Sequence, residues 1–511
     1  MFFKVISSRE STPSGLKNRV LLREDNWDDW FKFNTMYSLS YFDREGNENL
    51  IGSVKIGQFG MQSDQRRADI PTDFDFLDER FFSLGQDDSY YIDLNEQGEE
   101  VRDRVLDGLN DVARNEDIFT RSLDEKVTGT SLLRGPSVAT VRGQFRRIAN
   151  GGARLTDYHF SYTAPRRRGS KSEPVHLDFS IEPESLPPTN IHVLIGRNGV
   201  GKTYLLNNMV QCLLSEDEDI RFGTFDNTED DILGEQEFFA RLVSVSFSAF
   251  DTFEPLPIRQ DKSKGLQFTY IGLRNQSKDG EERPPKSPDN LATDFANSVL
   301  TCRQGTRLSR WRRALELLEA DPIFKAAEIS DLASDDLPTD DIKKDARSRY
   351  GKLSSGHKIV LLTITRLVET VEEKTLVLLD EPEAHLHPPL LSAFVRALSD
   401  LLINRNGVAL IATHSPVVLQ EVPKGCVWMI RRVGSVVNGE RPSIETFGEN
   451  VGVLTREVFG LEVAETGFHR MLREAVEEEY DYEDVVDRFS GALGGEARAL
   501  VRALFSTKDE G

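Results

Sequence analysis

Eight consecutive residues fit the pattern GxxxxGK[ST], in which a glycine-rich loop wraps the phosphates of a nucleotide: Gly196, Arg197, Asn198, Gly199, Val200, Gly201, Lys202 and Thr203. The apolar run 191–195 before this loop predicts a buried strand, and residues 204–210 after it predict a helix. In that setting the glycines let backbone N–H groups approach the phosphates, and the start of the helix adds positive potential. We expect Lys202 to reach the β- and γ-phosphates and Thr203 to hold Mg²⁺, so the loop predicts binding of ATP or GTP.

A second apolar run, residues 376–379, is followed by two acids, Asp380 and Glu381. A buried strand delivers such carboxylates to the C-terminal edge of its sheet, where nucleotide phosphates bind in open α/β folds. We expect Asp380 to join the Mg²⁺ shell and Glu381 to polarise the attacking water. Acids at a strand end can also be ordinary solvated residues, but the nucleotide loop in the same chain favours the catalytic interpretation.

Two further segments could contact the terminal phosphate. His414 follows the apolar strand candidate 408–413, and a neutral imidazole at that place can bond the γ-phosphate and sense its loss. Leu353-Ser354-Ser355-Gly356-His357 opens an apolar-periodic helix, 359–371. A serine at the cap, small residues and free N–H groups make this helix start an anion site, which we assign to Ser354, Ser355 and Gly356.

Together these segments resemble the heads of ABC-type ATPases, and the resemblance covers residues 155–435. Leu353-Ser354-Ser355-Gly356-His357 stands where that family has the signature LSGGQ, with Ser355 and His357 departing from it. The sequence from Asp380 to Pro388, with Thr413-His414-Ser415-Pro416, is similar to the SMC/RecF/OLD branch rather than to transporter subunits. The resemblance implies an α/β fold: a mixed sheet with covering helices, an antiparallel β-subdomain and a helical subdomain. It also implies a homodimer, because the signature helix of one subunit contacts the γ-phosphate held by the other.

Some positions leave alternatives open. Residues 384–387 correspond to the family's D-loop, which lies across the dimer axis. His385 and His387 could suggest a metal site there, although a helix start and interface packing fit the context better. The family's Gln after the second sheet strand is missing, and Ser248 or Asp251 are its candidate replacements. Three aromatic residues are candidates for stacking on the base, with core packing the favoured alternative: Tyr158, Phe160 and Tyr162.

The order of patterns along the chain divides it into five parts. We expect an N-terminal α+β region (1–150, with a hairpin at 34–57), an ATPase lobe with the nucleotide loop (151–260), a helical insertion (261–350), the signature, two-acid strand and histidine (351–440), and a helical tail (441–511). Residues 215–234 are predicted to be an acidic surface insertion and 331–349 a charged, irregular stretch. One helix is expected to carry Arg303, Arg307, Arg310, Arg312 and Arg313.

Composition limits the functional classes. The 511 residues include 63 basic and 85 acidic side chains, for a net charge of −22, which disfavours a large surface coating nucleic acid. Three scattered cysteines suggest a reducing compartment, and no apolar run has the length of a membrane span. We therefore expect a cytoplasmic protein without a membrane partner.

The spacing between motifs excludes some relatives of that branch. The gap from Asp251 to Leu353 is too short for a long coiled coil, and too little chain follows Pro423 for a TOPRIM nuclease domain. The remaining outline resembles the ATPase subunits of prokaryotic anti-phage systems such as Septu. This resemblance implies an ATPase that gates a separate effector, an HNH-type nuclease. Apolar positions at helical spacing in the tail from Gly467 onward suit the docking of that partner. Alternatively, the tail helices cover their own sheet, or the dimer clamps DNA directly as a repair ATPase. The arginines at 303–313 and 166–168 could serve DNA, but a solvated helix face and turn are favoured.

Overall fold

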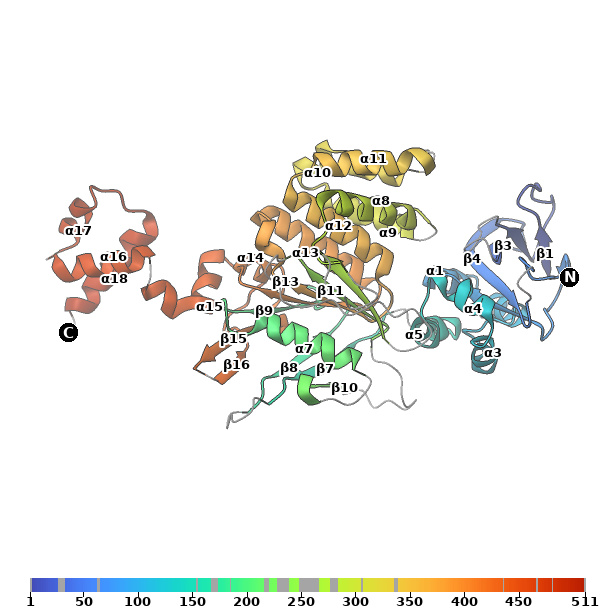
Figure 1. Cartoon of the computed structure of the whole chain (residues 1–511), viewed down its shortest axis with the longest axis horizontal. Coiled ribbons are helices and arrows are strands. Elements are labelled where there is room, and N and C mark those ends of the chain that lie inside the picture. The colour runs from blue at the N-terminus through green and yellow to red at the C-terminus, as the bar shows by residue number, and fades with distance from the viewer. Residues whose placement is uncertain are drawn as a thin grey trace.

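The computed structural model describes residues 2–25, 33–61, 65–152, 155–166, 173–183, 185–215, 220–227, 239–247, 266–275, 284–304, 307–334, 339–434, 436–465, 467–479 and 481–509. Figure 1 shows three parts in a row: an N-terminal region with its own sheet, a central head, and a helical tail at the opposite end. The two termini therefore lie at opposite ends of the molecule.

The N-terminal region is an α+β unit. Its sheet has the order β5-β1-β2-β3-β4-β6, and β1 and β2 form the parallel pair. The hairpin expected at 34–57 is confirmed as β3 and β4. Its strands are β1 (Phe3–Ile6), β2 (Arg19–Glu24), β3 (Met36–Phe42), β4 (Glu48–Gln58), β5 (Asp73–Phe74) and β6 (Phe81–Gly85). Its helices are α1 (Asp88–Glu96), α2 (Glu99–Gly108), α3 (Glu116–Ser122), α4 (Lys126–Thr130), α5 (Val138–Thr140) and α6 (Arg146–Ala149).

The head is built on a sheet with the order β12-β11-β13-β14-β9-β15-β16, parallel except for β16. Strands β9, β13 and β14 are apolar almost throughout, as expected for strands buried on both faces. The strands are β9 (Ile191–Ile195), β11 (Arg241–Ser246), β12 (Gln267–Gly272), β13 (Thr375–Asp380), β14 (Val408–Thr413), β15 (Val427–Val433) and β16 (Val436–Glu440).

Different layers cover the two faces of this sheet. One core joins a face of the sheet to a helical layer, and a second core joins the other face to α7 and a small antiparallel sheet, β10-β7-β8 (Figure 1). The helical layer contains α8 (Pro288–Cys302), α9 (Arg307–Leu318), α10 (Pro322–Ala326), α11 (Thr339–Lys352), α12 (Ser355–Thr370) and α13 (Pro388–Ile403). The other face has α7 (Lys202–Leu214), β7 (Tyr158–Thr163), β8 (His176–Ile181) and β10 (Thr224–Asn227). The predicted fold class is confirmed: a P-loop ATPase head of the ABC type, with an antiparallel β-subdomain, a helical subdomain and no coiled coil in the described residues.

Three local predictions were wrong. The acidic stretch 215–234 contains a strand, β10, because its residues pair with β7 and complete the small sheet. The stretch 331–349 includes most of α11, which packs on α8. The arginine-rich helix is two helices, since α8 ends at Cys302 with Arg303 as its C-cap and α9 begins at Arg307.

The tail forms a small bundle of its own. Helices α16 (Gly467–Glu478), α17 (Tyr482–Arg488) and α18 (Gly495–Asp509) share a core around Leu472, Val476, Val485 and Val501. Helix α15 (Val451–Glu465) connects this bundle to α14 (Pro416–Leu419) of the head. The alternative that the tail covers its own ATPase sheet is therefore wrong, because these helices bury their apolar faces against one another. Two apolar side chains stay exposed on α16, those of Phe468 and Met471.

The N-terminal region docks on the edge of the sheet where β13 and β14 begin. Buried Arg405, just before β14, pairs with Asp87 at 3.0 Å and with Asp88 at 2.7 Å. Glu372, just before β13, accepts hydrogen bonds from the Ser137 N–H and the Thr140 hydroxyl. Parallel strands begin at one edge and end at the other, so this interface lies opposite the edge that carries the acids and the nucleotide loop.

Candidate nucleotide site

The nucleotide loop connects β9 to α7 and depends on glycine at three places. A Cβ on Gly196 would lie 2.3 Å from the carbonyl oxygen of Ile430, so this position admits only glycine without a shift of β15. Gly199 and Gly201 have φ values of +79° and +109°, which L-residues rarely adopt. Nothing lies within 4 Å of a Cβ at either position, so it is the backbone conformation and not crowding that requires glycine there.

Lys202 is the first residue of α7, and its side chain is folded inward. The ammonium donates hydrogen bonds to the carbonyls of Gly196 at 3.0 Å and Arg197 at 3.1 Å. Its Nζ lies 4.0 Å from Oε1 of Glu381. Burial lowers the pKa of Lys202, against the opposite effect of nearby Glu381, Asp380 and Glu383. The acids thus compensate the buried ammonium only in part, and a phosphate group at the loop would supply further negative charge.

Thr203 and Asp380 come together although they are far apart in sequence. The Thr203 hydroxyl donates to Oδ1 of Asp380 at 3.1 Å. Register explains the contact, because β14 pairs with β9 through Thr413↔Ile195 and with β13 through Asp380↔Ala412, which brings the ends of these strands to one edge. A hydroxyl and a carboxylate oxygen at the start of α7 are ligands that Mg²⁺ accepts. These two residues therefore fit the metal that the sequence predicts.

Glu381 has an unusual backbone conformation. Its φ of 46° and ψ of 56° place it in the left-handed region, which costs free energy for a residue with a side chain. Its N–H donates to the carbonyl of Ala412 at 2.8 Å, and this bond holds the turn against β14. The carboxylate lies between Lys202 Nζ at 4.0 Å and His414 Nδ1 at 3.8 Å. The strained turn therefore directs the acid toward the space above the loop.

Sequence reasoning missed Glu383. Its Oε1 accepts hydrogen bonds from the Thr413 hydroxyl at 2.5 Å and the His414 N–H at 2.7 Å, and lies 3.1 Å from His414 Nδ1. The side chain is 8% exposed, whereas the His414 side chain is 45% exposed. Glu383 thus fixes both the backbone and the ring of the candidate phosphate sensor. Its position two residues after the acid pair was the available signal, but the prediction stopped at the end of the strand.

The signature segment starts α12 at the same edge of the sheet. Ser354 occupies the N-cap position, but its hydroxyl makes no cap hydrogen bond and instead contacts His357 Nδ1 at 2.7 Å. A Cβ on Gly356 would lie 2.3 Å from the carbonyl oxygen of His385, so α12 packs directly against residues 384–387. In the described part of the chain, residues 353–357 make no hydrogen bond or ion pair with the nucleotide loop. Ser354 and Ser355 are exposed instead.

The remaining candidates have different outcomes. Ser248 and Asp251 lie outside the described residues, and β11 ends with Ser246 paired in register with Asp380. The three aromatic residues considered for stacking on the base are at most 3% exposed and pack in the core on one face of the sheet, which confirms the packing alternative. They are Tyr158, Phe160 and Tyr162. His387 caps α13 through Nδ1, which accepts from the Leu390 N–H.

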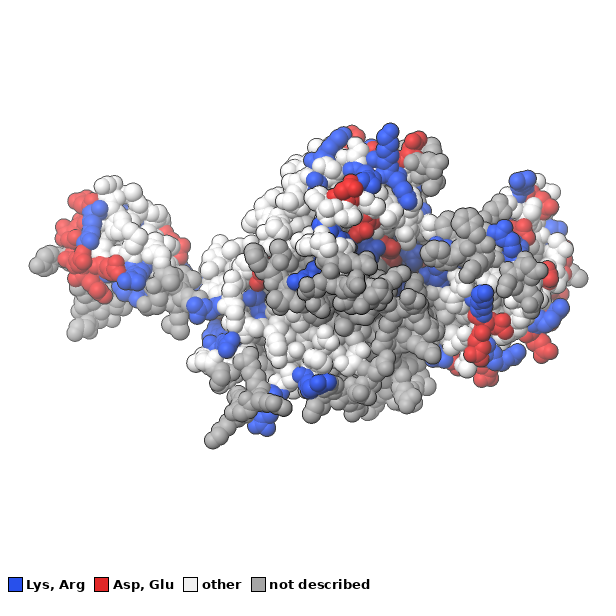
Figure 2. Space-filling view, in the orientation of Figure 1, with Lys and Arg blue, Asp and Glu red and all other residues white. Residues whose placement is uncertain are grey.

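Arg303 at the end of α8 and three arginines of α9 make contacts within the chain, which neither a solvated face nor a DNA surface would require. Arg303 donates to the carbonyls of Leu332 and Ser334, and Arg312 to that of Ala333. Arg310 lies 3.5 Å from Asp87, and Arg313 pairs with Asp400 at 2.5 Å. On the face drawn in Figure 2, basic and acidic side chains are interspersed over the described residues of the helical layer and the N-terminal region.

A comparison with characterised sequences identifies the family. Over 526 aligned positions, the chain is 41% identical to Protein ea59 of Escherichia phage lambda, and the alignment covers 100% of this chain and 99% of that protein. The chain belongs to the ea59 family. Within this ea59-family chain, residues 320–420 match a family model described as "AAA domain, putative AbiEii toxin, Type IV TA system". The matched segment contains the signature, the acid pair, Glu383 and His414, so this part of the chain is similar to an AAA-type ATPase domain.

Solved structures similar to the ea59-family chain are ATP-binding cassettes. A nucleotide-free ATP-binding cassette from an ABC transporter shares 12% identity, with 61% of this chain and 100% of that one covered and a TM-score of 0.31. The ADP conformation of the cassette MJ1267 shares 14% identity, with 52% and 85% covered and a TM-score of 0.29. At these scores the neighbours add nothing to the fold, which rests on the chain's own strand order and loop. Across the described residues, no helix combines the length and apolar character needed to cross a membrane.

Proposed function

We propose that this chain binds ATP with Mg²⁺, hydrolyses it slowly as a homodimer, and uses the cycle to gate a separate effector. The observation that carries the ATPase part is the convergence of Lys202, Thr203, Asp380, Glu381 and His414 on one edge of the sheet. Lys202 and Thr203 come from the loop and the start of α7, Asp380 and Glu381 from the end of β13 and His414 from the end of β14, and each suits a role that phosphoryl transfer to water requires.

The residues divide the chemistry among them. The loop amides and Lys202 hold the β- and γ-phosphates, and Thr203 with Asp380 would hold Mg²⁺, which neutralises phosphate charge when bound. Glu381 orients a water molecule for attack and accepts its proton at the carboxylate. His414, fixed by Glu383, donates to a γ-phosphate oxygen and loses that partner when phosphate leaves.

The dimer follows from the signature segment. The exposed start of α12, with Ser354 and Ser355, offers N–H groups to an anion but has no anion-binding partner in its own chain among the described residues. It lies against residues 384–387, which would cross the dimer axis. A second copy of this chain would place its nucleotide loop against this helix start, so that each ATP contacts both subunits.

Two observations support the proposal that the chain gates an effector: the scarcity of metal-ligating groups among the described residues, and the phage origin of its relative, Protein ea59. Within the described residues, the only grouping of three or more metal-ligating side chains other than the nucleotide edge is Asp321, His357 and His387. We infer that destructive chemistry lies in a partner, a nuclease of the HNH type acting on DNA in defence against phages, in the cytoplasm. The relative is a phage protein, which is compatible with competition between phages. Phe468 and Met471 on the tail are exposed apolar side chains that such a partner could cover.

Glu381→Gln tests the ATPase proposal. The variant should bind ATP as the wild type does, because Lys202 and Asp380 remain, yet lose most turnover. Loss of water orientation costs several kcal/mol in the barrier, on the order of 100-fold or more in kcat. Glu440→Gln on β16, whose side chain is 52% exposed, is the matched control and should keep normal turnover. Near-normal hydrolysis by Glu381→Gln would remove Glu381 from this role.

A second experiment tests the effector. Purified chain with ATP and Mg²⁺ or Mn²⁺ should leave plasmid and linear DNA intact, and co-expression with its neighbouring genes should yield a complex that cuts DNA. Metal-dependent cutting that stays with the chain through chromatography and persists in Lys202→Ala would show that the nuclease is the chain itself. Salt-sensitive DNA binding by the chain alone would instead support the DNA clamp.

A further inference from the structure

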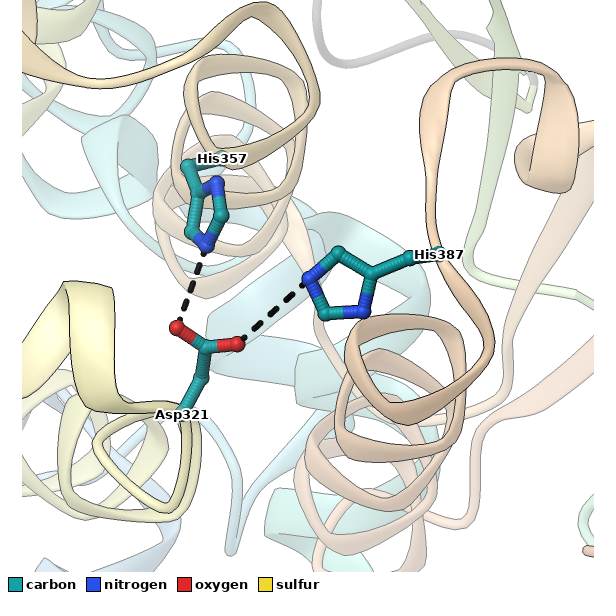
Figure 3. A group of neighbouring side chains, drawn as sticks. All are labelled: Asp321, His357 and His387. Atoms are coloured by element: carbon teal, nitrogen blue, oxygen red, sulfur yellow. Dashed lines mark hydrogen bonds and ion pairs between the residues drawn. The ribbon is translucent and has the colours of Figure 1, made fainter.

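We propose that Asp321, His357 and His387 form a zinc-type transition-metal site, separate from the Mg²⁺ of the nucleotide. The three side chains come from three segments that meet only in the fold: the N-cap of α10, the first turn of α12 and the N-cap of α13. One carboxylate oxygen and one ring nitrogen from each histidine lie within 4.8 Å of one another. In Figure 3 both imidazole rings point at the carboxylate of Asp321 from different sides.

The separations suit a small metal ion. Nε2 of His357 lies 3.1 Å from Oδ1 of Asp321, and Nε2 of His387 lies 3.7 Å from Oδ2. Tetrahedral zinc bound at 2.0–2.1 Å keeps its ligand atoms about 3.3 Å apart, close to the 3.7 Å between His387 Nε2 and Oδ2, whereas the 3.1 Å of His357 is measured to the other carboxylate oxygen, Oδ1. Oδ2 accepts no hydrogen bond from the described residues, so it is the free oxygen for a metal. The nitrogen and oxygen ligands favour zinc over magnesium, which prefers oxygen alone.

Burial leaves one position open to solvent. The side chains of Asp321 and His357 are 7% and 3% exposed, whereas that of His387 is 49% exposed. Water and a metal ion can therefore reach the group from the side of His387, and a water molecule would complete four-coordination. Oδ1 of Asp321 accepts hydrogen bonds from the Ile323 N–H at 2.8 Å and the Phe324 N–H at 3.4 Å, which hold the carboxylate in place.

The surroundings also suit metal-bound histidine. Nδ1 of His357 lies 2.7 Å from the Ser354 hydroxyl, so this nitrogen can donate its proton to Ser354 and leave Nε2 free for a metal. Metal binding through Nε2 of His387 has a cost, because the ring proton then moves to Nδ1, which now accepts a hydrogen bond from the Leu390 N–H. That hydrogen bond is 3.4 Å long, beyond the usual range, and its loss is a small cost against a metal bond. A bound ion would tie together the starts of α10, α12 and α13 within the helical layer.

Metal stoichiometry of the full-length protein tests the site independently of ATP hydrolysis. After exposure to Zn²⁺ and removal of loosely bound ions, elemental mass spectrometry should find one zinc per chain. Co²⁺ in its place should give the strong visible absorption of tetrahedral cobalt. Asp321→Asn and His387→Asn keep an oxygen that can cap their helices, so they should fold normally and bind less than about one tenth of an equivalent. Ser354→Ala should weaken zinc binding about tenfold, since the partner of Nδ1 is lost.

His385→Asn is the matched control, because His385 is an exposed histidine two residues from His387 and outside the group. It should bind zinc as the wild type does. Thermal unfolding in chelator, where no metal is bound, checks that the variants are folded. Absence of zinc from the wild-type chain, or equal loss in His385→Asn and His387→Asn, would overturn the proposal and leave Asp321 as a hydrogen-bond partner of His357 alone.

Discussion

The substitution Glu383→Gln should disturb the position of His414, and with it ATP hydrolysis, while leaving nucleotide binding intact. The carboxylate accepts two short hydrogen bonds at Oε1, from the Thr413 hydroxyl at 2.5 Å and the His414 N–H at 2.7 Å. A charge-assisted hydrogen bond contributes about 1.5–3 kcal/mol and a neutral one about 0.5–1.5 kcal/mol. Glutamine keeps an acceptor oxygen but loses the charge, so each bond weakens by about 1 kcal/mol. The pair loses about 2 kcal/mol, and kcat should fall about tenfold to thirtyfold.

Steady-state hydrolysis measures the effect of Glu383→Gln on kcat, and nucleotide titration measures its effect on ATP affinity. ATP affinity of Glu383→Gln should stay within about threefold of wild type, because Lys202, Thr203 and the loop amides do not contact Glu383 through a hydrogen bond. Glu372→Gln is the control: Glu372 is also buried and accepts from a hydroxyl and an N–H, but at the opposite edge of the sheet. It should lower stability without lowering kcat. Unchanged kcat in Glu383→Gln, or an equal fall in both variants, would refute the assignment of Glu383.

Three further expectations follow from single contacts. Gly196→Ala should abolish ATP binding and lower the unfolding midpoint, since its Cβ would meet the Ile430 carbonyl at 2.3 Å; nucleotide titration and thermal melts check both effects. Burial opposes ionisation of Glu372, but Arg241 and hydrogen bonds outweigh it and lower its pKa. Its stabilising effect is therefore present above the ordinary pKa of about 4.3 and is lost as pH falls through the lower folded value, so the difference in unfolding free energy between wild type and Glu372→Gln should shrink below about pH 4. Removal of residues 467–511 should leave ATP binding intact, because the tail bundle has its own core; an unfolded head would contradict this.

The sequence predicted that the loop, the acid pair and the histidine follow strands of one sheet, and it could do so because each of these parts is local. The loop, the acid pair and the histidine each follow an apolar strand, and parallel strands that end at one edge bring such residues together. Thr203 and Asp380 meet as expected, and β9, β13 and β14 lie within one residue of their predicted ranges.

What the sequence did not reveal depends on pairing across long separations. Strand β10 lies in an acidic stretch and is a strand only because β7 offers it an edge. The contacts of Arg310 and Arg405 with Asp87 join segments more than 200 residues apart, so charge alone could not distinguish them from a solvated face. Asp321 is 36 residues from His357, and no local pattern links them. Glu383 could have been predicted from the sequence, because the turn at Glu381 returns the chain toward β14.

Mixing two inactive variants tests the composite ATP site most directly. Lys202→Ala removes the phosphate-binding lysine, and Ser354→Arg places a long side chain where the partner's phosphate would lie. Each homodimer should be inactive in ATP hydrolysis, while Ser354→Arg should still bind nucleotide. In an equimolar mixture, the heterodimer keeps one site with an intact Lys202 facing an intact Ser354. We predict that the mixture regains up to about one quarter of wild-type turnover, since half of the dimers are mixed and each has one good site. Full activity of Ser354→Arg alone would contradict the account.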